Sequence, residues 1–489
     1  MTVPYWVQDA VFYQIFPDRF ANGDRQNDPA NVQPWGSPPT GRNFMGGDLR
    51  GIIQKFDYLL DLGINAIYLN PIFQSASNHR YSTIDYYKID PKLGGLQDFK
   101  ALLEVAHHNG VRVILDGVFN HCGRGFFAFV DLLENQQDSA YKDWYHVKEF
   151  PVEAYSPGEA REYLGWWKIK SLPKFNTSNP RVRSYLLDVA RFWIAQGADG
   201  WRLDVPNEID DDEFWGEFRR AVKTINPEAY LVGEVWEQDP RWVGEGHFDG
   251  LMNYPVRKAL LEVLSGSPAR MLIPDTAHGL SAEEARGLSP DELKMTHFAG
   301  KIESNLKAYP RENSFAMYVP LGSHDTERAL TMLEGNVNKL KLAYLFLFAY
   351  PGAPALYYGD EIGLLGGKDP ACRGAFPWEA EQWNLELHTY VKRLISIRKN
   401  LPVLRRGEYR PVLADNRHRC FGFARRLGDT AVLILLNLGA TRQHLRLPVS
   451  ELGWEDGRIL HCLLEREEII VSGDTVAVSL PAWSGKWLI

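Results

Sequence analysis

The feature that most constrains the fold is a repeated alternation of short apolar runs with segments of helical spacing. Runs 11–16, 64–69 and 111–115 are predicted to be buried strands, and segments 52–62 and 95–109 between them are predicted helices that stop at a glycine. Further apolar runs extend the alternation, at 200–204, 230–234, 248–251, 315–321 and 355–358. Eight strands that alternate with helices favour an α/β fold of the closed (β/α)8 TIM-barrel type over an open doubly wound sheet.

Two regions depart from this alternation. Residues 117–176 form an aromatic-rich connection far longer than an ordinary loop, and long insertions after a barrel strand are usually functional. We therefore predict an inserted lid domain there. From residue 401 onward, short alternating runs predict a C-terminal antiparallel β-sandwich domain at 401–489. The catalytic barrel is then expected to comprise residues 1–116 and 177–400.

Composition and charge argue against several classes of partner. The net charge is -8 with no basic block, so neither nucleic acid nor an anionic membrane surface is expected as a partner. No apolar run approaches the roughly 18 residues of a membrane span, and no secretory leader is evident at the amino terminus. The four cysteines are scattered, which is typical of reduced thiols. We expect a cytoplasmic protein with no organic cofactor.

The stretch 200–208 contains an arginine and a carboxylate at the end of a predicted strand. Arg202 and Asp204 are two residues apart, so both side chains are expected on the same face of the strand. A structural ion pair and a catalytic device both fit this stretch taken alone.

Other predicted strand ends favour the catalytic alternative. Asp116 and His121 follow the third strand, Glu234 the fifth, and His324 and Asp325 the seventh. The carboxyl ends of barrel strands meet at one rim, where uncompensated acids would repel one another. A catalytic pocket therefore explains this collection better than structural coincidence does.

These stretches resemble the four signature regions of the α-amylase family of glycoside hydrolases, in order, at 116–121, 200–208, 234–236 and 322–325. The resemblance implies that Asp204 is the nucleophile, Glu234 the general acid/base and Asp325 a carboxylate that stabilises the transition state. Retaining hydrolysis needs the first two carboxyl groups about 5–5.5 Å apart. We expect Arg202 to keep Asp204 ionised, and a raised pKa for Glu234.

The same resemblance implies a set of substrate-binding residues around the cleavage point. Tyr81 is expected to stack on the sugar, and Asp369 with Arg373 to bind the next sugar on the non-reducing side. The complete predicted set is Tyr81, His121, Arg202, Trp236, Asn207, Glu208, His324, Asp369 and Arg373.

Two stretches resemble one branch of that family, the neopullulanases, cyclomaltodextrinases and maltogenic amylases. Residues 172–176 match a marker region of this branch except that Leu172 and Phe175 replace Met and Leu, and 205–208 also resembles it. The resemblance implies hydrolysis of cyclodextrins, pullulan and maltooligosaccharides, with glycosyl transfer as a further activity. An α-1,6-preferring debranching enzyme is an alternative. A catalytically silent glucan-binding protein is another, against which the intact acids argue.

The branch typically carries an N-terminal β-domain that builds a dimer. The first barrel strand begins here at residue 11, so we expect that domain to be absent and any homodimer to use another surface.

An oxygen-rich loop near the amino terminus has two interpretations. Asn, Asp and Gly are turn formers, but they also supply the carboxylate, amide and carbonyl oxygens that Ca²⁺ prefers. The same spacing is a calcium site in relatives of this branch. We therefore predict a structural Ca²⁺ site formed by Asn22, Asp24, Asn27, Asp28, Gly46 and Asp48.

Overall fold

The computed structural model describes residues 3–269 and 287–489. Its centre is an eight-stranded parallel sheet in the order β8-β7-β6-β5-β2-β1-β10-β9. A parallel bridge between Met252 and Tyr318 links the two edge strands and brings the sheet close to a closed barrel. The predicted (β/α)8 barrel is therefore confirmed. The strands are β1 Phe12–Ile15, β2 Ala66–Leu69, β5 Arg112–Gly117, β6 Gly200–Leu203, β7 Tyr230–Gly233, β8 Gly250–Leu251, β9 Tyr318–Pro320 and β10 Ala353–Tyr357.

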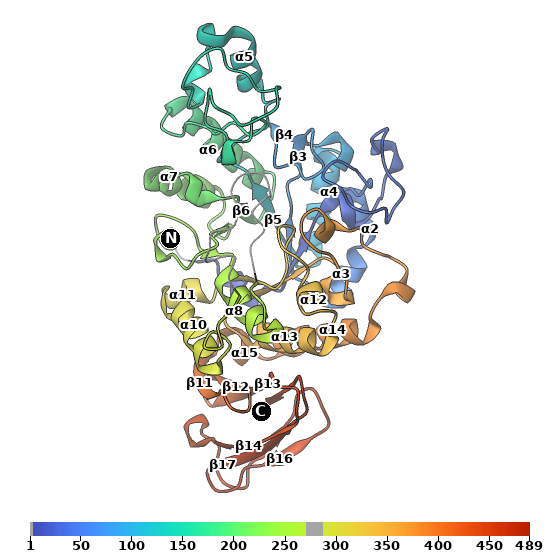
Figure 1. Cartoon of the computed structure of the whole chain (residues 1–489), viewed down its shortest axis with the longest axis vertical. Helices are drawn as coiled ribbons and strands as arrows, with labels where there is room; N and C mark the ends of the chain where they lie inside the picture. Colours follow the sequence, from blue (N-terminus) through green and yellow to red (C-terminus); the bar gives the residue numbers. More distant parts are fainter. Residues whose placement is uncertain (1–2, 270–286) are drawn as a thin grey trace.

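Helices surround the barrel strands (Figure 1). The predicted helix 52–62 is two helices, because the backbone leaves helical geometry at Lys55 (φ -102°, ψ 13°). The longer helices are α2 Leu49–Gln54, α3 Phe56–Leu62, α4 Leu96–His108, α6 Pro180–Ala195, α7 Asp212–Ile225, α8 Tyr254–Ser265, α10 Met295–Lys307, α13 Val337–Ala349 and α14 Leu385–Asn400. The one-turn helices are α1 Pro17–Phe20, α11 Arg311–Ser314 and α12 Ala329–Met332.

Close contact between β6 and β7 depends on a glycine. A Cβ atom at Gly200 would lie 2.1 Å from the carbonyl oxygen of Tyr230 on the neighbouring strand, a distance that no side chain tolerates. The two strands pair in parallel with Arg202 opposite Val232. This register places the residues that follow β6 and β7 side by side at the carboxyl rim.

Residues 117–176 leave the barrel between β5 and α6, and Figure 1 shows them at one end of the long axis, around α5 Phe127–Asn135. An antiparallel bridge between His121 and Lys174 ties the two ends of this segment together. A smaller hairpin, β3 Phe73–Ser75 and β4 Thr83–Ile89, follows β2 and holds Tyr81 in its turn. Both connections leave from the carboxyl ends of barrel strands.

Antiparallel sheets form the C-terminal region, at the opposite end of the long axis (Figure 1). The prediction that helices cease at residue 401 is wrong by one short helix, α15 Pro402–Arg406, which begins at a proline. The apolar faces of the sheets share one buried cluster. The strands are β11 Glu408–Asp415, β12 Cys420–Leu427, β13 Thr430–Asn437, β14 Gln443–Pro448, β15 Ile459–His461, β16 Glu468–Ile470, β17 Thr475–Leu480 and β18 Ser484–Leu488.

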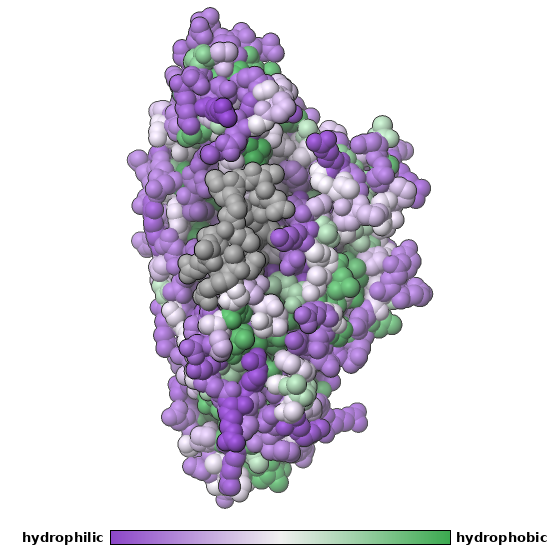
Figure 2. All heavy atoms as spheres, viewed as in Figure 1, coloured by the Kyte–Doolittle hydropathy of each residue, from purple (hydrophilic) through white to green (hydrophobic). Residues whose placement is uncertain are grey.

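The face of the molecule in Figure 2 is mainly hydrophilic, with hydrophobic residues in small scattered groups. Within residues 3–269 and 287–489, no helix combines the length and the apolar character that crossing a membrane requires.

Candidate active site

Arg202 on β6 is the centre of the carboxyl rim of the barrel. Its Nη1 lies 2.8 Å from Oδ1 of Asp116 and 2.8 Å from Oδ1 of Asp204, and its Nη2 lies 2.6 Å from Oε1 of Glu234. Sequence reasoning paired Arg202 with Asp204 alone. In the structure, the one buried guanidinium contacts three carboxylates, which lie at the ends of the adjacent strands β5, β6 and β7.

Burial dominates the ionisation of the two central carboxyl groups. It raises the pKa of Asp204 to about 7 by outweighing the attraction of Arg202, and repulsion by Asp116 and Asp325 adds to the rise. Arg202 favours the ionised form of Asp204, the direction expected from the sequence, but burial outweighs this attraction and the net shift of the pKa is upward. Burial, with the negative charges of Asp204 and Asp325, also raises the pKa of Glu234 well above its ordinary value despite Arg202. This direction agrees with the expectation for Glu234.

Asp325, which follows β9, is held in its ionised form. Burial alone would raise its pKa, but attraction to His324, a hydrogen bond with that imidazole and the nearby charge of Arg373 outweigh burial and lower it. Nε2 of His324 lies 2.9 Å from Oδ2 of Asp325, and Nη2 of Arg373 lies 3.3 Å from Oδ1. Nη2 of Arg373 also lies 3.1 Å from Asp369. The predicted pair Asp369 and Arg373 thus adjoins Asp325.

Tyr81 connects the β3–β4 turn to this cluster. Its hydroxyl donates to Oδ2 of Asp116 at 2.6 Å and lies 2.5 Å from Nε2 of His324. Asp116 accepts a second hydroxyl, that of Tyr68, at 2.6 Å. Nδ1 of His324 is contacted from the other side by Gln14 at 2.9 Å. One hydrogen-bonded network therefore fixes Tyr81 and His324 relative to the rim carboxylates.

His121 lies at the start of the inserted segment and is fully buried. Its ring stacks on Trp166 with centroids 5.1 Å apart, and its Nδ1 lies 3.1 Å from the side-chain nitrogen Nδ2 of Asn120. Its Nε2 is buried without a hydrogen-bond partner. Burial and the charge of Lys174 lower the pKa of His121 to about 3, so the imidazole is neutral.

Trp236, two residues after Glu234, is half-buried and stacks on Tyr254. The ring centroids are 3.6 Å apart and the planes differ by 8°. Tyr254 begins α8 and was not among the predicted site residues. Together the two rings form an aromatic surface next to the predicted acid/base.

Asn207 and Glu208 are exposed on the short 3-10 helix Pro206–Glu208. Nζ of Lys174, from the end of the inserted segment, lies 2.8 Å from Oε2 of Glu208 and donates to its carbonyl oxygen at 3.2 Å. A cavity of about 510 Å³ adjoins this pair, lined mainly by polar side chains that include Asn120 and Arg241. The inserted segment thus contacts the barrel four residues beyond Asp204.

Sequence reasoning missed the residues that support the site. Tyr68 and Gln14 lie within predicted barrel strands, where each looked like part of the core. Only their positions near the carboxyl ends of those strands could have identified them, because alternation along a strand does not show which residue reaches the rim.

The oxygen-rich loop folds around Asp48. Its carboxylate accepts backbone N–H groups of Gly23, Asp24 and Gly51 and the side-chain amide of Asn27. Asp48 therefore organises the loop and caps α2. The remaining predicted ligands gather nearby: Nδ2 of Asn22 donates to Asp28 at 2.8 Å.

Two observations show that this loop suits a cation. The side-chain oxygens of Asn22 and Asn27 are buried without hydrogen-bond partners. Gly46 has φ 82°, and a Cβ there would lie 2.2 Å from Oδ1 of Asp28. Unsatisfied buried oxygens and a space that only glycine leaves open are both compatible with Ca²⁺.

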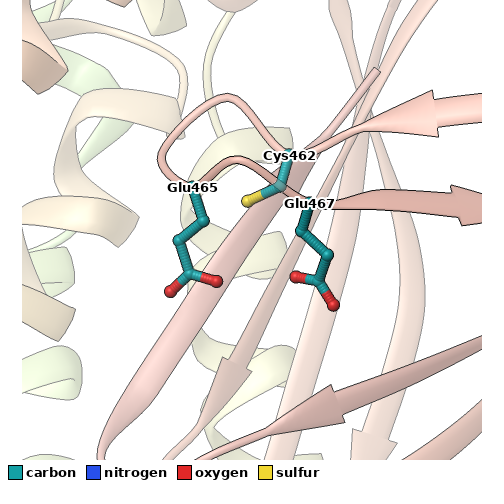
Figure 3. A group of neighbouring side chains, drawn as sticks. All are labelled: Cys462, Glu465 and Glu467. Carbon is teal, nitrogen blue, oxygen red and sulfur yellow. The ribbon is translucent and has the colours of Figure 1, made fainter.

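A second group of potential metal ligands lies in the C-terminal region. Cys462, Glu465 and Glu467 approach one another after β15 (Figure 3). The buried ammonium of Lys486 lies 3.6 Å from Glu465 and forms an ion pair with Glu467. An ion pair with a lysine therefore accounts for these carboxylates.

Comparison with known proteins identifies the family. The family model of the alpha amylase catalytic domain matches residues 14–385 of this chain. A cyclomaltodextrinase from Geobacillus thermopakistaniensis is 42% identical over 483 residues, which is 98% of this chain and 76% of that protein. The structure resembles a cyclic α-maltosyl-(1→6)-maltose hydrolase from Arthrobacter globiformis (TM-score 0.85, 39% identity, 100% of both chains). It also resembles a debranching enzyme from Nostoc punctiforme (TM-score 0.87, 41% identity, 100% of this chain and 99% of that one).

The match covers well over half of the chain, and the carboxylates of the predicted signature regions converge on one guanidinium at the carboxyl rim of a (β/α)8 barrel. The resemblance noted in the sequence is therefore confirmed: this chain belongs to the α-amylase family of glycoside hydrolases, with relatives among the cyclomaltodextrinases.

Proposed function

We propose that the chain is a retaining hydrolase of α-glucosidic bonds in cyclodextrins, pullulan and maltooligosaccharides, with glycosyl transfer as a side activity. The observation that carries this proposal is the shared guanidinium of Arg202. Because adjacent nitrogens of one group contact Asp204 and Glu234, the two carboxyl groups are held close together. Close spacing favours direct attack by a carboxylate over attack by an intervening water.

In this mechanism ionised Asp204 attacks the anomeric carbon while protonated Glu234 gives its proton to the leaving oxygen. Glu234 then removes a proton from water, which releases the sugar from Asp204 with retained configuration. The raised pKa of Glu234 suits the first step. Asp325, kept ionised beside His324 and Arg373, stabilises the positive charge that develops on the sugar ring.

The remaining predicted residues hold the substrate. Tyr81 supplies a flat ring beside the cleavage point, and neutral His121 offers a buried Nε2 for a sugar hydroxyl. Trp236 stacked on Tyr254 provides an apolar surface for the sugar on the leaving side. Asn207 and Glu208 stand where that portion of the substrate would leave the rim.

Two observations favour an α-1,6-preferring debranching enzyme as a second candidate. The Nostoc punctiforme debranching enzyme and the Arthrobacter globiformis hydrolase, whose name specifies a substrate with a 1→6 linkage, both match this chain over essentially their full lengths. The cyclomaltodextrinase relative is longer than the match. These coverages make the bond preference the main property to measure.

Product analysis separates the two candidates. Equal masses of β-cyclodextrin, pullulan and a branched maltooligosaccharide are incubated with the enzyme and with Glu234→Gln. Ring opening of β-cyclodextrin to maltose and glucose supports the first candidate. Release of intact linear chains from the branched substrate alone supports the second. The anomeric configuration of the first product, read by proton NMR, should be α in either case, and a β product contradicts retention.

The Ca²⁺ site is part of the same proposal. Asn22, Asn27 and Asp28 would supply side-chain oxygens and Gly46 a carbonyl oxygen, while Asp24 and Asp48 complete the loop. The loop precedes α2, so the ion would fix the β1–α2 connection and carry no chemical step. We also propose a cytoplasmic location and, for any homodimer, an interface outside the branch's N-terminal domain.

A further inference from the structure

Val205, directly after the predicted nucleophile, has a backbone conformation that its sequence disfavours. Its φ is 36° and its ψ is 52°, which is the left-handed region. A β-branched side chain rarely adopts positive φ. The following residue is Pro206, which favours an extended conformation at the position before it. Two independent local preferences are therefore overridden at one residue, and strain of this kind concentrates at functional sites.

This conformation directs a backbone donor at the predicted acid/base. The amide N–H of Val205 donates to Oε2 of Glu234 at 3.1 Å. The neighbouring amide N–H, that of Asp204, donates instead to the carbonyl of Gly117 on β5. The carbonyl oxygen of Val205 accepts from Glu208 and starts the short helix Pro206–Glu208. The strained residue is thus the point at which the chain turns from the nucleophile toward Glu234.

We propose that Val205 is a positioning residue whose strained backbone aims its N–H at Glu234, so that the developing carboxylate is stabilised as Glu234 gives up its proton. The inference rests on the proposed acid/base role of Glu234. A hydrogen bond from an N–H group to a carboxyl oxygen is stronger when that carboxyl is ionised. The contact therefore strengthens from the ground state to the transition state of proton transfer, which is the condition for catalysis.

The test compares Val205→Gly with Val205→Ala. Glycine adopts positive φ without penalty but also leaves it freely, so the N–H is no longer held toward Glu234. Alanine shortens the side chain and retains a Cβ, so it keeps more of the backbone restriction. We expect kcat on maltotriose to fall about tenfold in Val205→Gly, as for partial loss of a hydrogen bond to a charged group, and to stay within about threefold of wild type in Val205→Ala.

Two further measurements identify proton transfer as the affected step. The kcat/KM for α-maltosyl fluoride, which reports the attack by Asp204 and needs no proton from Glu234, should be the same in Val205→Gly and wild type. The basic limb of the pH dependence of kcat/KM should move to higher pH, because losing this donor raises the pKa of Glu234. A merely structural effect of the substitution would lower the rates on both substrates alike and leave the basic limb of the pH profile unchanged.

Glu334→Gly is the matched control. Glu334 has φ 55° and is exposed in the turn between α12 and α13, so glycine removes strain there without touching the site. Its kinetics should equal those of wild type. Wild-type turnover of maltotriose by Val205→Gly overturns the inference, as does an equal loss in Val205→Ala. If Glu234→Gln keeps wild-type turnover of maltotriose, the proposed function fails instead.

Discussion

Replacing the predicted nucleophile should stabilise the protein. Burial, opposed by Arg202 and reinforced by Asp116 and Asp325, raises the pKa of Asp204 from 3.8 to about 7. Above pH 7 the group is ionised in both states and destabilises the folded one. The pKa difference corresponds to at most about 4 kcal/mol. This figure already includes the attraction of Arg202. In Asp204→Asn one carboxyl oxygen becomes an amide NH2 group, which cannot accept a hydrogen bond from Arg202, so we expect a net gain of about 2 kcal/mol at pH 8.

The pH dependence has a definite sign. Between about pH 4 and pH 7 the folded state binds more protons at Asp204 than the unfolded state does, so stability from this group falls as pH rises. The gain in Asp204→Asn should therefore be full above pH 7 and absent below about pH 4. Unfolding entropy for 489 residues is about 1 kcal/mol/K, so the melting temperature should rise by about 2 °C at pH 8.

Asp325→Asn is the matched comparison because its expected effect is opposite. Burial raises the pKa of Asp325, but His324, Arg373 and Arg202 outweigh burial and lower it, so the ionised group stabilises the folded state at neutral pH. That stability is lost only as pH falls through the folded pKa. Calorimetric melting of both variants at pH 8 and pH 4 is the assay. A lower melting temperature for Asp204→Asn at pH 8, or shifts of equal sign in the two variants, would refute the reasoning.

Three further predictions concern the site and the loop. Because Asp204 must be ionised to attack, the acidic limb of kcat/KM on maltotriose should lie near pH 7, and a limb at about pH 4 would count against the buried carboxylate. Tyr81→Phe keeps the ring but loses its hydroxyl contacts with Asp116 and His324, so kcat should fall about tenfold with KM nearly unchanged. A kcat equal to that of wild type would show that these hydrogen bonds do not contribute to catalysis. Chelation should lower the melting temperature of wild type. It should leave that of Gly46→Ala unchanged, because a Cβ there would lie 2.2 Å from Oδ1 of Asp28 and disrupt the proposed site. A wild-type melting temperature that does not respond to chelation would exclude the proposed ion.

The sequence predicted what depends on local pattern. Apolar runs and helical spacing located all eight barrel strands, and the order of the acidic strand ends at 116, 204, 234 and 325 pointed to one rim. The same logic placed His324 near those acids, whereas Tyr81 was implied only by the resemblance to the family. It did not reveal that Tyr68 also reaches the rim, because a tyrosine within an apolar strand looks like core.

Long-range sharing and backbone strain could not be predicted. Asp116 lies 86 positions before Arg202, and no local sequence pattern indicates that Asp116 also accepts a hydrogen bond from the guanidinium of Arg202. Burial is the main reason that the pKa of Asp204 rises, where a simple ion pair with Arg202 predicts the reverse, and repulsion by Asp116 adds to the rise. Val205 precedes a proline and is β-branched, so local preference predicts an extended residue at the position where tertiary contacts impose a left-handed one.

The central claim is that Asp204 forms a covalent glycosyl intermediate whose release depends on Glu234. Glu234→Gln is treated with 5-fluoro-α-maltosyl fluoride, in which the fluoride leaves without a proton and the ring fluorine slows release, and the digested protein is measured by mass spectrometry. The account predicts one added 5-fluoromaltosyl group on the peptide that contains Asp204. Unlabelled protein that nevertheless turns over the reagent, or a label on any other residue, would contradict it.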